Sequence, residues 1–256
     1  MNEKKNILVT GAASGIGYGI AEYLAQQGHN IIISDIQADA AEKAAEAICA
    51  QQLSACAIAL DVTDKAAIAT LSERPECESV DVVVNNAGLQ HVSKIEDFPA
   101  EKWQLLIDVM LVGPALMTQT FLAGMRKRNY GRIINVGSLH SLVASPYKSA
   151  YIAAKHGLLG FAKTIALETG DTDITINTLC PAYVKTPLVE NQIAAQAKAN
   201  NMSEEDVINK IMLEPMPKKA FITIEELAQT AAFLMSPAAR NITGQTMVLD
   251  GGWVAR

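Results

Sequence analysis

The chain has 256 residues, half of them hydrophobic and 19% charged, with a formal net charge of −6 at pH 7. This is enough apolar sequence for one sizeable core, and the negative charge argues against nucleic acid or an anionic membrane surface as a partner. An acidic substrate is not excluded, because a pocket can be locally basic. We therefore expect one domain over residues 1–256, with neither a nucleic-acid nor a membrane partner.

The cysteines form no Cys-x-x-Cys pair and have no histidine-rich surroundings, so they predict neither a disulfide framework nor a metal site. The N-terminal stretch MNEKKNILVTG runs directly into a strand pattern, with no signal-peptide pattern and no apolar run of transmembrane length elsewhere. These features predict a cytoplasmic protein with reduced thiols. The four cysteines are Cys49, Cys56, Cys77 and Cys180.

Short β-branched runs alternate with longer helical stretches, such as 15–28 and 100–128. The runs are almost continuously apolar, which is typical of strands buried on both faces. This β-α-β alternation predicts an α/β fold with a parallel, doubly wound sheet and helices on both faces. The predicted strands are 6–10, 31–34, 56–60, 80–85, 132–137, 174–179 and 246–249.

One region, at about 187–217, departs from this alternation. It is polar and alanine-rich, and Pro215 and Pro217 close it. It predicts two helices inserted before the last strand. Such an insertion is either an elaboration without function or a lid over a site, and we favour a lid.

A glycine cluster, VTGAASGIG, follows the first predicted strand and begins a helix. Gly11, Gly15 and Gly17 permit a tight turn and close approach of the backbone to a ligand, and the helix N-terminus offers free N–H groups to a pyrophosphate. The spacing is Gly-x3-Gly-x-Gly rather than the usual Gly-x-Gly-x-x-Gly, so an ordinary tight turn is the alternative.

Asp35 follows the second predicted strand, 24 residues beyond Gly11. A carboxylate there accepts hydrogen bonds from both hydroxyls of an adenosine ribose. It also repels a 2′-phosphate, since like charges about 4 Å apart cost roughly 4 kcal/mol at an effective dielectric of 20. The glycine loop offers Ala12 and Ala13 rather than an arginine. These features predict NAD rather than NADP, with a solvated loop aspartate as the alternative.

Polar residues end two more predicted strands. Asp61 follows the third strand, and Asn85 and Asn86 follow the fourth. Ligands of open parallel sheets bind outside the carboxyl ends of the strands, so we expect these side chains to face one crevice. Asp61 fits a helix N-cap equally well.

Tyr151 and Lys155 lie four residues apart in SPYKSAYIAAKHG, on one face of a predicted helix. A nearby ammonium favours the phenolate, so we expect the pKa of Tyr151 to lie below its usual value of about 10. Such a phenol is a usable general acid and base. Ser138, at the end of the fifth predicted strand, is placed to donate to the same substrate oxygen. A solvated helix face is the alternative.

TGAASGIG, NNAG, the serine of NVGS and the Tyr-x3-Lys of YIAAK occur in this order and together resemble the short-chain dehydrogenase/reductase family over the whole chain. The resemblance implies a Rossmann-like fold, hydride transfer with a nicotinamide cofactor, a homotetramer, and catalytic roles for Ser138, Tyr151 and Lys155. The cofactor-binding residues that it implies are Gly11, Ser14, Gly15, Ile16, Gly17, Asp35, Asp61, Val62, Asn86, Ala87, Gly88, Tyr151, Lys155, Pro181, Val184 and Thr186.

Two positions depart from the family pattern. The family has an asparagine in the helix after the fourth strand, which anchors a water of the proton relay, where this chain has Met110. Either the relay uses the backbone carbonyl of Met110 or activity is impaired. The family's Pro-Gly after the sixth strand is Pro181-Ala182 here, a mild change if φ of Ala182 is negative.

Several stretches, among them NNAGLQH, SLHSLVAS, TPLVENQ and DGGWVAR, resemble the bacterial members of the family that interconvert D-3-hydroxybutyrate and acetoacetate. This implies a small hydroxy-acid substrate whose carboxylate is bound by polar side chains. An ammonium near the active phenol, here Lys148, suits a carboxylate. The implied substrate-binding residues are Gln90, Ser138, His140, Lys148, Tyr151, Gln192 and Trp253.

Alternatives remain at this stage. The enzyme could act on another small hydroxy or oxo compound, such as a sugar acid or a 3-oxoacyl thioester, although Lys148 and His140 argue against a bulky thioester. The chain could also be a dinucleotide sensor or scaffold with inactive chemistry, a reading that Met110 alone supports. Among single residues, His140 could be a loop histidine, Gln192 a solvated helix residue and Trp253 part of a subunit interface.

Overall fold

The computed structural model describes residues 4–255, apart from the side chains of residues 187, 188, 191, 195, 199 and 200. Seven parallel strands form one sheet in the order β3-β2-β1-β4-β5-β6-β7, so the predicted seven-stranded Rossmann-like fold is confirmed. The strand order reverses between β1 and β4, and a crevice at the carboxyl ends of these strands follows from that reversal. The strands are β1 (Asn6–Thr10), β2 (Asn30–Asp35), β3 (Ser54–Ala59), β4 (Val82–Asn85), β5 (Gly131–Val136), β6 (Ile174–Pro181) and β7 (Thr246–Leu249).

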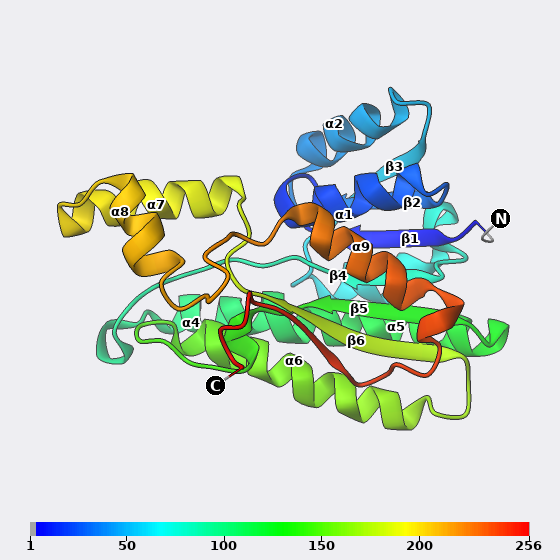
Figure 1. Cartoon of the computed structure of the whole chain (residues 1–256). Coiled ribbons are helices and arrows are strands. Elements are labelled where there is room, and N and C mark those ends of the chain that lie inside the picture. The colour runs from blue at the N-terminus through cyan, green and yellow to red at the C-terminus, as the bar shows by residue number, and fades with distance from the viewer. Residues whose placement is uncertain (1–3, 256) are drawn as a thin grey trace.

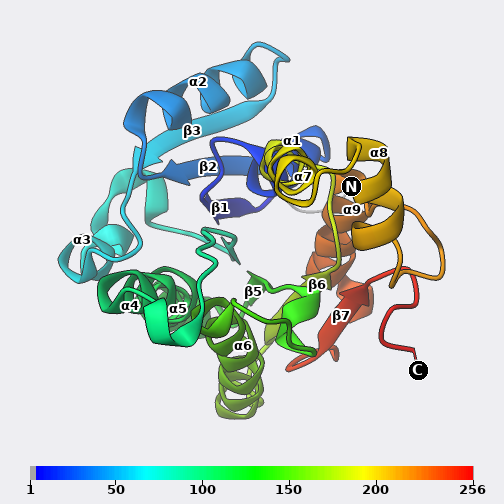
Figure 2. The same cartoon turned by 90° about the vertical axis from the view of Figure 1, so that its left-hand side faces the viewer.

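Helices cover both faces of the sheet (Figures 1 and 2). The helices over one face are α1 (Gly15–Gln26), α2 (Ala38–Cys49) and α9 (Ile224–Met235), and those over the other are α3 (Lys65–Ala69), α4 (Ala100–Ile107), α5 (Gly113–Arg128) and α6 (Ser149–Glu168). Along β1, Ile7 and Val9 belong to the first core and Leu8 to the second. Because successive side chains enter opposite cores, the central strands are apolar on both faces over much of their length.

Burial on both faces holds for the central strands but is wrong for the two edge strands. β3 and β7 are partly exposed, and Val248 of β7 has 39% of its surface accessible. Each edge strand has a single neighbour, and the covering helices do not extend fully over it. Apolar sequence alone did not distinguish an edge strand from a central one.

The stretch 100–128 forms one long helical segment that a π-helical turn, Asp108–Val112, divides into α4 and α5. Contrary to our expectation, this segment is long and apolar enough to cross a membrane. Length and composition are weak evidence, because core helices meet the same criteria. Leu106, Met117 and Phe121 point into the second core, which accounts for the apolar composition.

The insertion contains α7 (Pro187–Asn200) and the short α8 (Glu204–Val207), which continues into a π-helical turn, Ile208–Met212. It projects beyond the carboxyl ends of the strands, on the side of α1 and α9 (Figure 1). A small apolar cluster joins its parts. The buried members of that cluster are Val189, Ile193, Val207 and Met212.

Near the carboxyl ends of the central strands, polar side chains replace the apolar ones. Asn85, Asn135 and Thr178 lie at matching positions of β4, β5 and β6, and Asn85 Nδ2 donates to Asn135 Oδ1 at 2.9 Å. Both asparagines are buried. Asn85 therefore joins strands within the sheet, and the expectation that it faces the crevice is wrong.

Candidate active site

The glycine loop between β1 and α1 has the conformation that its sequence requires. Gly11 and Gly15 have φ of +60° and +59°, values that other residues rarely adopt. A Cβ at Gly17 would lie 2.4 Å from Asn86 Nδ2, so a side chain there would displace that amide. The same amide donates to the carbonyls of Thr10 and Gly11, both at 2.9 Å. The NNAG segment thereby holds the loop in place.

The start of α1 suits an anionic group. Its N-cap, Ser14, makes no side-chain capping bond, and no acidic residue lies in the first turn. A Cβ at Gly15 would meet nothing within 4 Å, so the loop leaves open space beside the first N–H groups of the helix. Free N–H groups and the positive helix end fit the pyrophosphate of a dinucleotide.

Two carboxylates lie at or just after the ends of the neighbouring strands β2 and β3, and the first of them contacts this loop. Asp35 accepts the backbone N–H of Ala13 at 3.2 Å and that of Gln37 at 3.1 Å, so it lies against the glycine loop. Asp61 accepts the N–H and hydroxyl of Thr63, both at 2.8 Å and both through Oδ1. The N-cap of α3 is Asp64, so the N-cap reading of Asp61 is wrong.

The other predicted cofactor residues lie near the carboxyl ends of the same strands. Ala87 donates its N–H to the Thr10 hydroxyl at 3.1 Å. Val184 pairs with Ile222 beside the insertion, and Thr186 caps α7 by accepting the N–H of Val189 at 3.4 Å. The rest of the set is Ile16 at the start of α1, Val62 after β3, Gly88 after β4 and Pro181 at the end of β6.

Met110 and Ala182, the two residues that depart from the family pattern, lie in different surroundings. Met110 is 1% exposed within the π-helical turn, and a Cβ at Gly88 would lie 3.7 Å from its sulfur. An apolar side chain thus occupies the place of the family's amide. Ala182 is not among the positive-φ residues of the described chain, so alanine is accommodated there as expected.

Ser138, Tyr151 and Lys155 come together where β5 ends against α6. Ser138 forms a hydrogen bond with the Tyr151 phenol. Lys155 Nζ donates to the carbonyl of Val136 at 2.6 Å and lies 5.7 Å from the centroid of the Tyr151 ring. The three side chains therefore converge, with the Lys155 ammonium over the ring of Tyr151.

The pKa of Tyr151 does not follow the expectation. Burial raises this pKa above its usual value, and the hydrogen bond with Ser138 only partly opposes the rise. Burial also lowers the pKa of Lys155 to about 8. The prediction of a lowered Tyr151 pKa is wrong because spacing on a helix says nothing about desolvation. The protonated phenol that results is a proton donor at neutral pH.

Lys148 and His140 form the side of the site next to the phenol. Lys148 Nζ lies 3.4 Å from His140 Nε2, and the His140 ring meets the Tyr151 ring edge-on at 6.3 Å between centroids. Within the described part of the chain, Lys148 has no ion pair with a carboxylate. Burial, with Lys148 adding to it, lowers the pKa of His140 to about 4.

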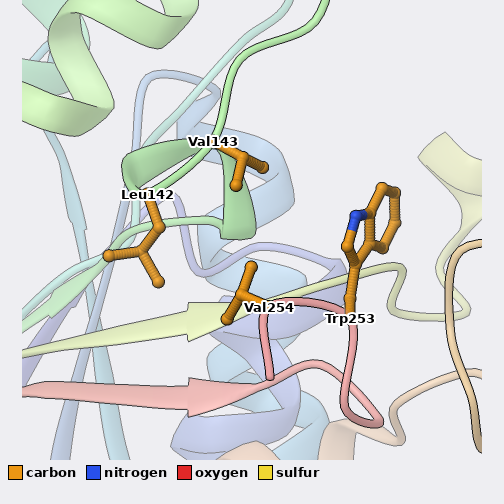
Figure 3. Close-up of a pocket in the computed structure, with 4 residues that line it drawn as sticks. All are labelled: Leu142, Val143, Trp253 and Val254. Atoms are coloured by element: carbon orange, nitrogen blue, oxygen red, sulfur yellow. The ribbon is translucent and has the colours of Figure 1, made fainter. Parts of the chain in front are cut away.

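The remaining predicted substrate residues are not joined to this cluster by hydrogen bonds. Gln90 accepts the backbone N–H of its neighbour His91 at 3.0 Å, and Gln192 lies half-buried on α7. Trp253 packs against Tyr183, with 6.0 Å between ring centroids. It also faces the segment that follows His140 across an open pocket of about 530 Å³ (Figure 3). The pocket is lined by Leu142, Val143, Trp253 and Val254.

Sequence reasoning missed two residues at this site, Ser141 and Cys180. Both are buried directly behind Ser138, and the Cys180 thiol is free. The sequence identifies Cys180 only as one of four reduced thiols. Its place at the end of the strand β6 was the one available signal.

Comparison with known proteins agrees with this geometry. A family model described as enoyl-(acyl carrier protein) reductase matches residues 11–254. A D-beta-hydroxybutyrate dehydrogenase of Cupriavidus necator is 44% identical over 254 residues, 98% of each chain. The chain belongs to the short-chain dehydrogenase/reductase family. It is therefore an oxidoreductase of a family that uses nicotinamide cofactors, and the sensor or scaffold reading lacks support.

Two other relatives of this short-chain dehydrogenase/reductase are similar over nearly their whole length. A D-beta-hydroxybutyrate dehydrogenase of Rhizobium meliloti is 43% identical over 256 residues, covering 98% of this chain and 99% of the relative. An uncharacterized oxidoreductase of Bacillus subtilis, YxjF, is 42% identical over 255 residues, 99% of each chain. The enzyme thus resembles proteins with and without an assigned substrate.

We expect His140 to titrate near pH 4 rather than 6.5, because burial and the Lys148 ammonium disfavour its cation. Between these pH values the unfolded chain binds more protons than the folded one, so stability falls as the pH drops through this window. The His140→Gln variant should lose this part of the pH dependence in denaturant unfolding. The His156→Gln variant, at an exposed position of α6, is the control and should keep it. An imidazole titration near 6.5 by NMR would contradict the expectation.

Proposed function

We propose that this enzyme interconverts D-3-hydroxybutyrate and acetoacetate with NAD as the cofactor. The observation that carries the proposal is Lys148. Its ammonium is half-buried, has no carboxylate partner in the described residues, and stands three residues before Tyr151 at the start of α6. A buried cation without a counterion is costly, and a substrate carboxylate would supply the missing charge.

The spacing of the two groups favours a short hydroxy acid. Side chains three positions apart on a helix are neighbours, so a carboxylate on Lys148 leaves the alcohol oxygen of a short acid within reach of Tyr151. His140, neutral at the working pH, accepts from Lys148 and steadies its ammonium. The acyl group of a 3-oxoacyl thioester carries no carboxylate for Lys148 to bind, which supports the small acid.

Each residue then has a definite part in the reaction. When bound, NAD supplies the acceptor or donor of the hydride. Tyr151 gives a proton to the carbonyl oxygen in the reductive direction and takes it back in the oxidative one, while Ser138 donates to the same oxygen. Lys155 holds its ammonium against the Val136 carbonyl, over the ring of Tyr151. Because burial raises the pKa of Tyr151, alcohol oxidation by the enzyme should be favoured at alkaline pH.

The names of the relatives support the substrate without deciding it. Two relatives at 44% and 43% identity are named D-beta-hydroxybutyrate dehydrogenases. Another, of Bacillus subtilis, is named 2-dehydro-3-deoxy-D-gluconate 5-dehydrogenase at 33% identity over 259 residues. A sugar acid also carries a carboxylate for Lys148, so it is the second candidate.

A direct assay tests the substrate. Formation of NADH is measured with D-3-hydroxybutyrate, L-3-hydroxybutyrate and a panel of sugar acids, each with NAD and with NADP. We expect the highest kcat/KM for D-3-hydroxybutyrate with NAD. A higher kcat/KM for a sugar acid would replace the proposed substrate by the second candidate.

The preference for NAD is tested at Asp35. The Asp35→Asn variant removes the charge that repels a 2′-phosphate and keeps an acceptor for the N–H of Gln37, although it loses the acceptor for the N–H of Ala13. Like charges about 4 Å apart cost roughly 4 kcal/mol at a dielectric of 20, and solvent reduces this. We expect the ratio of kcat/KM for NAD over NADP to fall about ten- to a hundredfold. Asp35→Ala should also weaken NAD binding. An unchanged ratio in both variants would mean that Asp35 does not contact the ribose.

We also propose a cytoplasmic homotetramer, in line with the family resemblance. Val248 on the edge strand β7 and Phe233 on α9 are large apolar side chains that remain exposed in the single chain. The insertion has its own apolar cluster and projects beyond the carboxyl ends of the strands, so we propose that it moves as one unit and acts as a lid over the crevice. Gln192 on α7 would then reach a bound acid when the lid closes.

A further inference from the structure

Behind Ser138 lies a pair of buried polar side chains that the proposed reaction does not use. Ser141 is 1% exposed and Cys180 is fully buried. Ser141 ends the short 3₁₀ turn Leu139–Ser141 after β5, whereas Cys180 comes from β6. They meet beside Gly137, where an added Cβ would lie 2.9 Å from Ser141 Oγ and 3.0 Å from Cys180 Sγ. Gly137 therefore leaves the space in which these two groups approach the end of β5.

Ser141 lies between Cys180 and the backbone of Ser138. Hydrogen bonding with Ser141 and with the Ser138 backbone partly offsets the rise that burial causes in the pKa of the Cys180 thiol. The side-chain oxygen of Ser141 accepts the backbone N–H of Ser138 at 3.2 Å, and its own N–H bonds back to the Ser138 carbonyl at 2.8 Å. Ser141 thus holds the Ser138 backbone through two hydrogen bonds, one from the Ser138 N–H and one to its carbonyl.

The Ser138 hydroxyl is constrained from a second side. Its oxygen accepts the backbone N–H of His140 at 3.1 Å. With one lone pair directed at His140, the hydroxyl proton points elsewhere, and the hydrogen bond of Ser138 is with Tyr151. Ser141 is linked to the Ser138 hydroxyl through the 3₁₀ turn that it closes, because the His140 N–H of that turn bonds the Ser138 oxygen.

We propose that Ser141 is a positioning residue: by closing the turn at Ser138 it keeps the His140 N–H on the Ser138 oxygen, and so sets the direction in which the Ser138 hydroxyl donates. The inference rests on the proposed function, because it gives Ser138 and Tyr151 their parts in the reaction. Ser141 is buried and reaches neither substrate nor cofactor. Its removal should therefore lower the rate of the chemical step and leave binding intact.

The Ser141→Ala variant tests this role. We expect kcat to fall about tenfold, in the range of one net hydrogen bond, with KM for substrate and cofactor within about twofold of the parent. The pH profile of kcat/KM for alcohol oxidation should shift to higher pH, because a misdirected Ser138 no longer lowers the pKa of Tyr151.

The control is Thr169→Val, which removes another buried hydroxyl. Thr169 is fully buried and bonds the carbonyl of Ile165 at 2.8 Å, at the far end of α6 from Tyr151. It should lower the unfolding temperature with kcat and the pH profile unchanged. If Ser141→Ala behaves like this control, Ser141 is merely structural and the inference is overturned.

A spectroscopic measurement separates this inference from the proposed substrate. If the parent enzyme oxidises neither the hydroxy acids nor the sugar acids, the proposed function fails, and the positioning role is decided by NMR of tyrosine labelled at 13Cζ. The Tyr151 signal is assigned by its loss in Tyr151→Phe. We expect Ser141→Ala to move it in the same direction as Ser138→Ala. A Tyr151 signal that Ser141→Ala leaves in place overturns the inference.

Discussion

Replacement of Tyr151 by phenylalanine should lower kcat by about 10²- to 10⁴-fold, the usual contribution of a general acid or base, while NAD still binds. The variant removes one hydroxyl from a side chain that packs in the second core, so the fold should be retained. Steady-state kinetics in both directions, with calorimetric titration of NAD, measure the two effects separately.

A matched control is Tyr130→Phe. Tyr130 precedes β5 at the amino end of the sheet, and its hydroxyl is 3.5 Å from the carbonyl of Met235. This variant should keep full turnover. If the kcat of Tyr151→Phe stays within about tenfold of the parent value, the phenol takes no part in the proton transfer. The reductive step would then have no assigned proton donor.

Replacement of Lys148 is expected to have the second largest effect. A hydrogen bond to a charged group contributes roughly 1.5–3 kcal/mol, so Lys148→Ala should lower kcat/KM for 3-hydroxybutyrate about ten- to a hundredfold. KM for the acid should rise far more than KM for NAD. Part of the loss should appear in kcat, because a poorly anchored acid presents its reacting carbon badly to the nicotinamide.

The charge of the substrate provides the decisive comparison. A neutral alcohol that the parent oxidises, even slowly, should lose little in the same variant. Lys148→Met keeps the apolar length of the side chain and should reproduce the loss, which separates charge from packing. Lys163→Ala, at an exposed position further along α6, is the control. Equal, small losses for charged and neutral substrates would exclude Lys148 from carboxylate binding and would undermine the hydroxy-acid proposal.

The sequence by itself was sufficient to predict the parallel sheet and the glycine loop that fits a dinucleotide. Continuous apolar runs predict buried parallel strands, and Gly11, Gly15 and Gly17 predict a turn that only glycine adopts easily. Tyr151 and Lys155 share a helix face because their spacing is about one helical turn. Each of these properties depends on neighbours along the chain, so the order of residues determines it.

Other properties depend on contacts between distant segments, and only the tertiary structure decided them. Desolvation by the surrounding core, not the neighbouring ammonium, controls the pKa of Tyr151. The partner of Asn85 is Asn135, 50 residues away, which turns an expected crevice residue into a link between strands. Cys180 and Ser141 meet behind Ser138 because β5 and β6 are adjacent in the sheet. Residue types and spacing thus determined the fold and the chemistry available to this protein, whereas burial and long-range contacts determined the direction of its hydrogen bonds and the charge state of its groups.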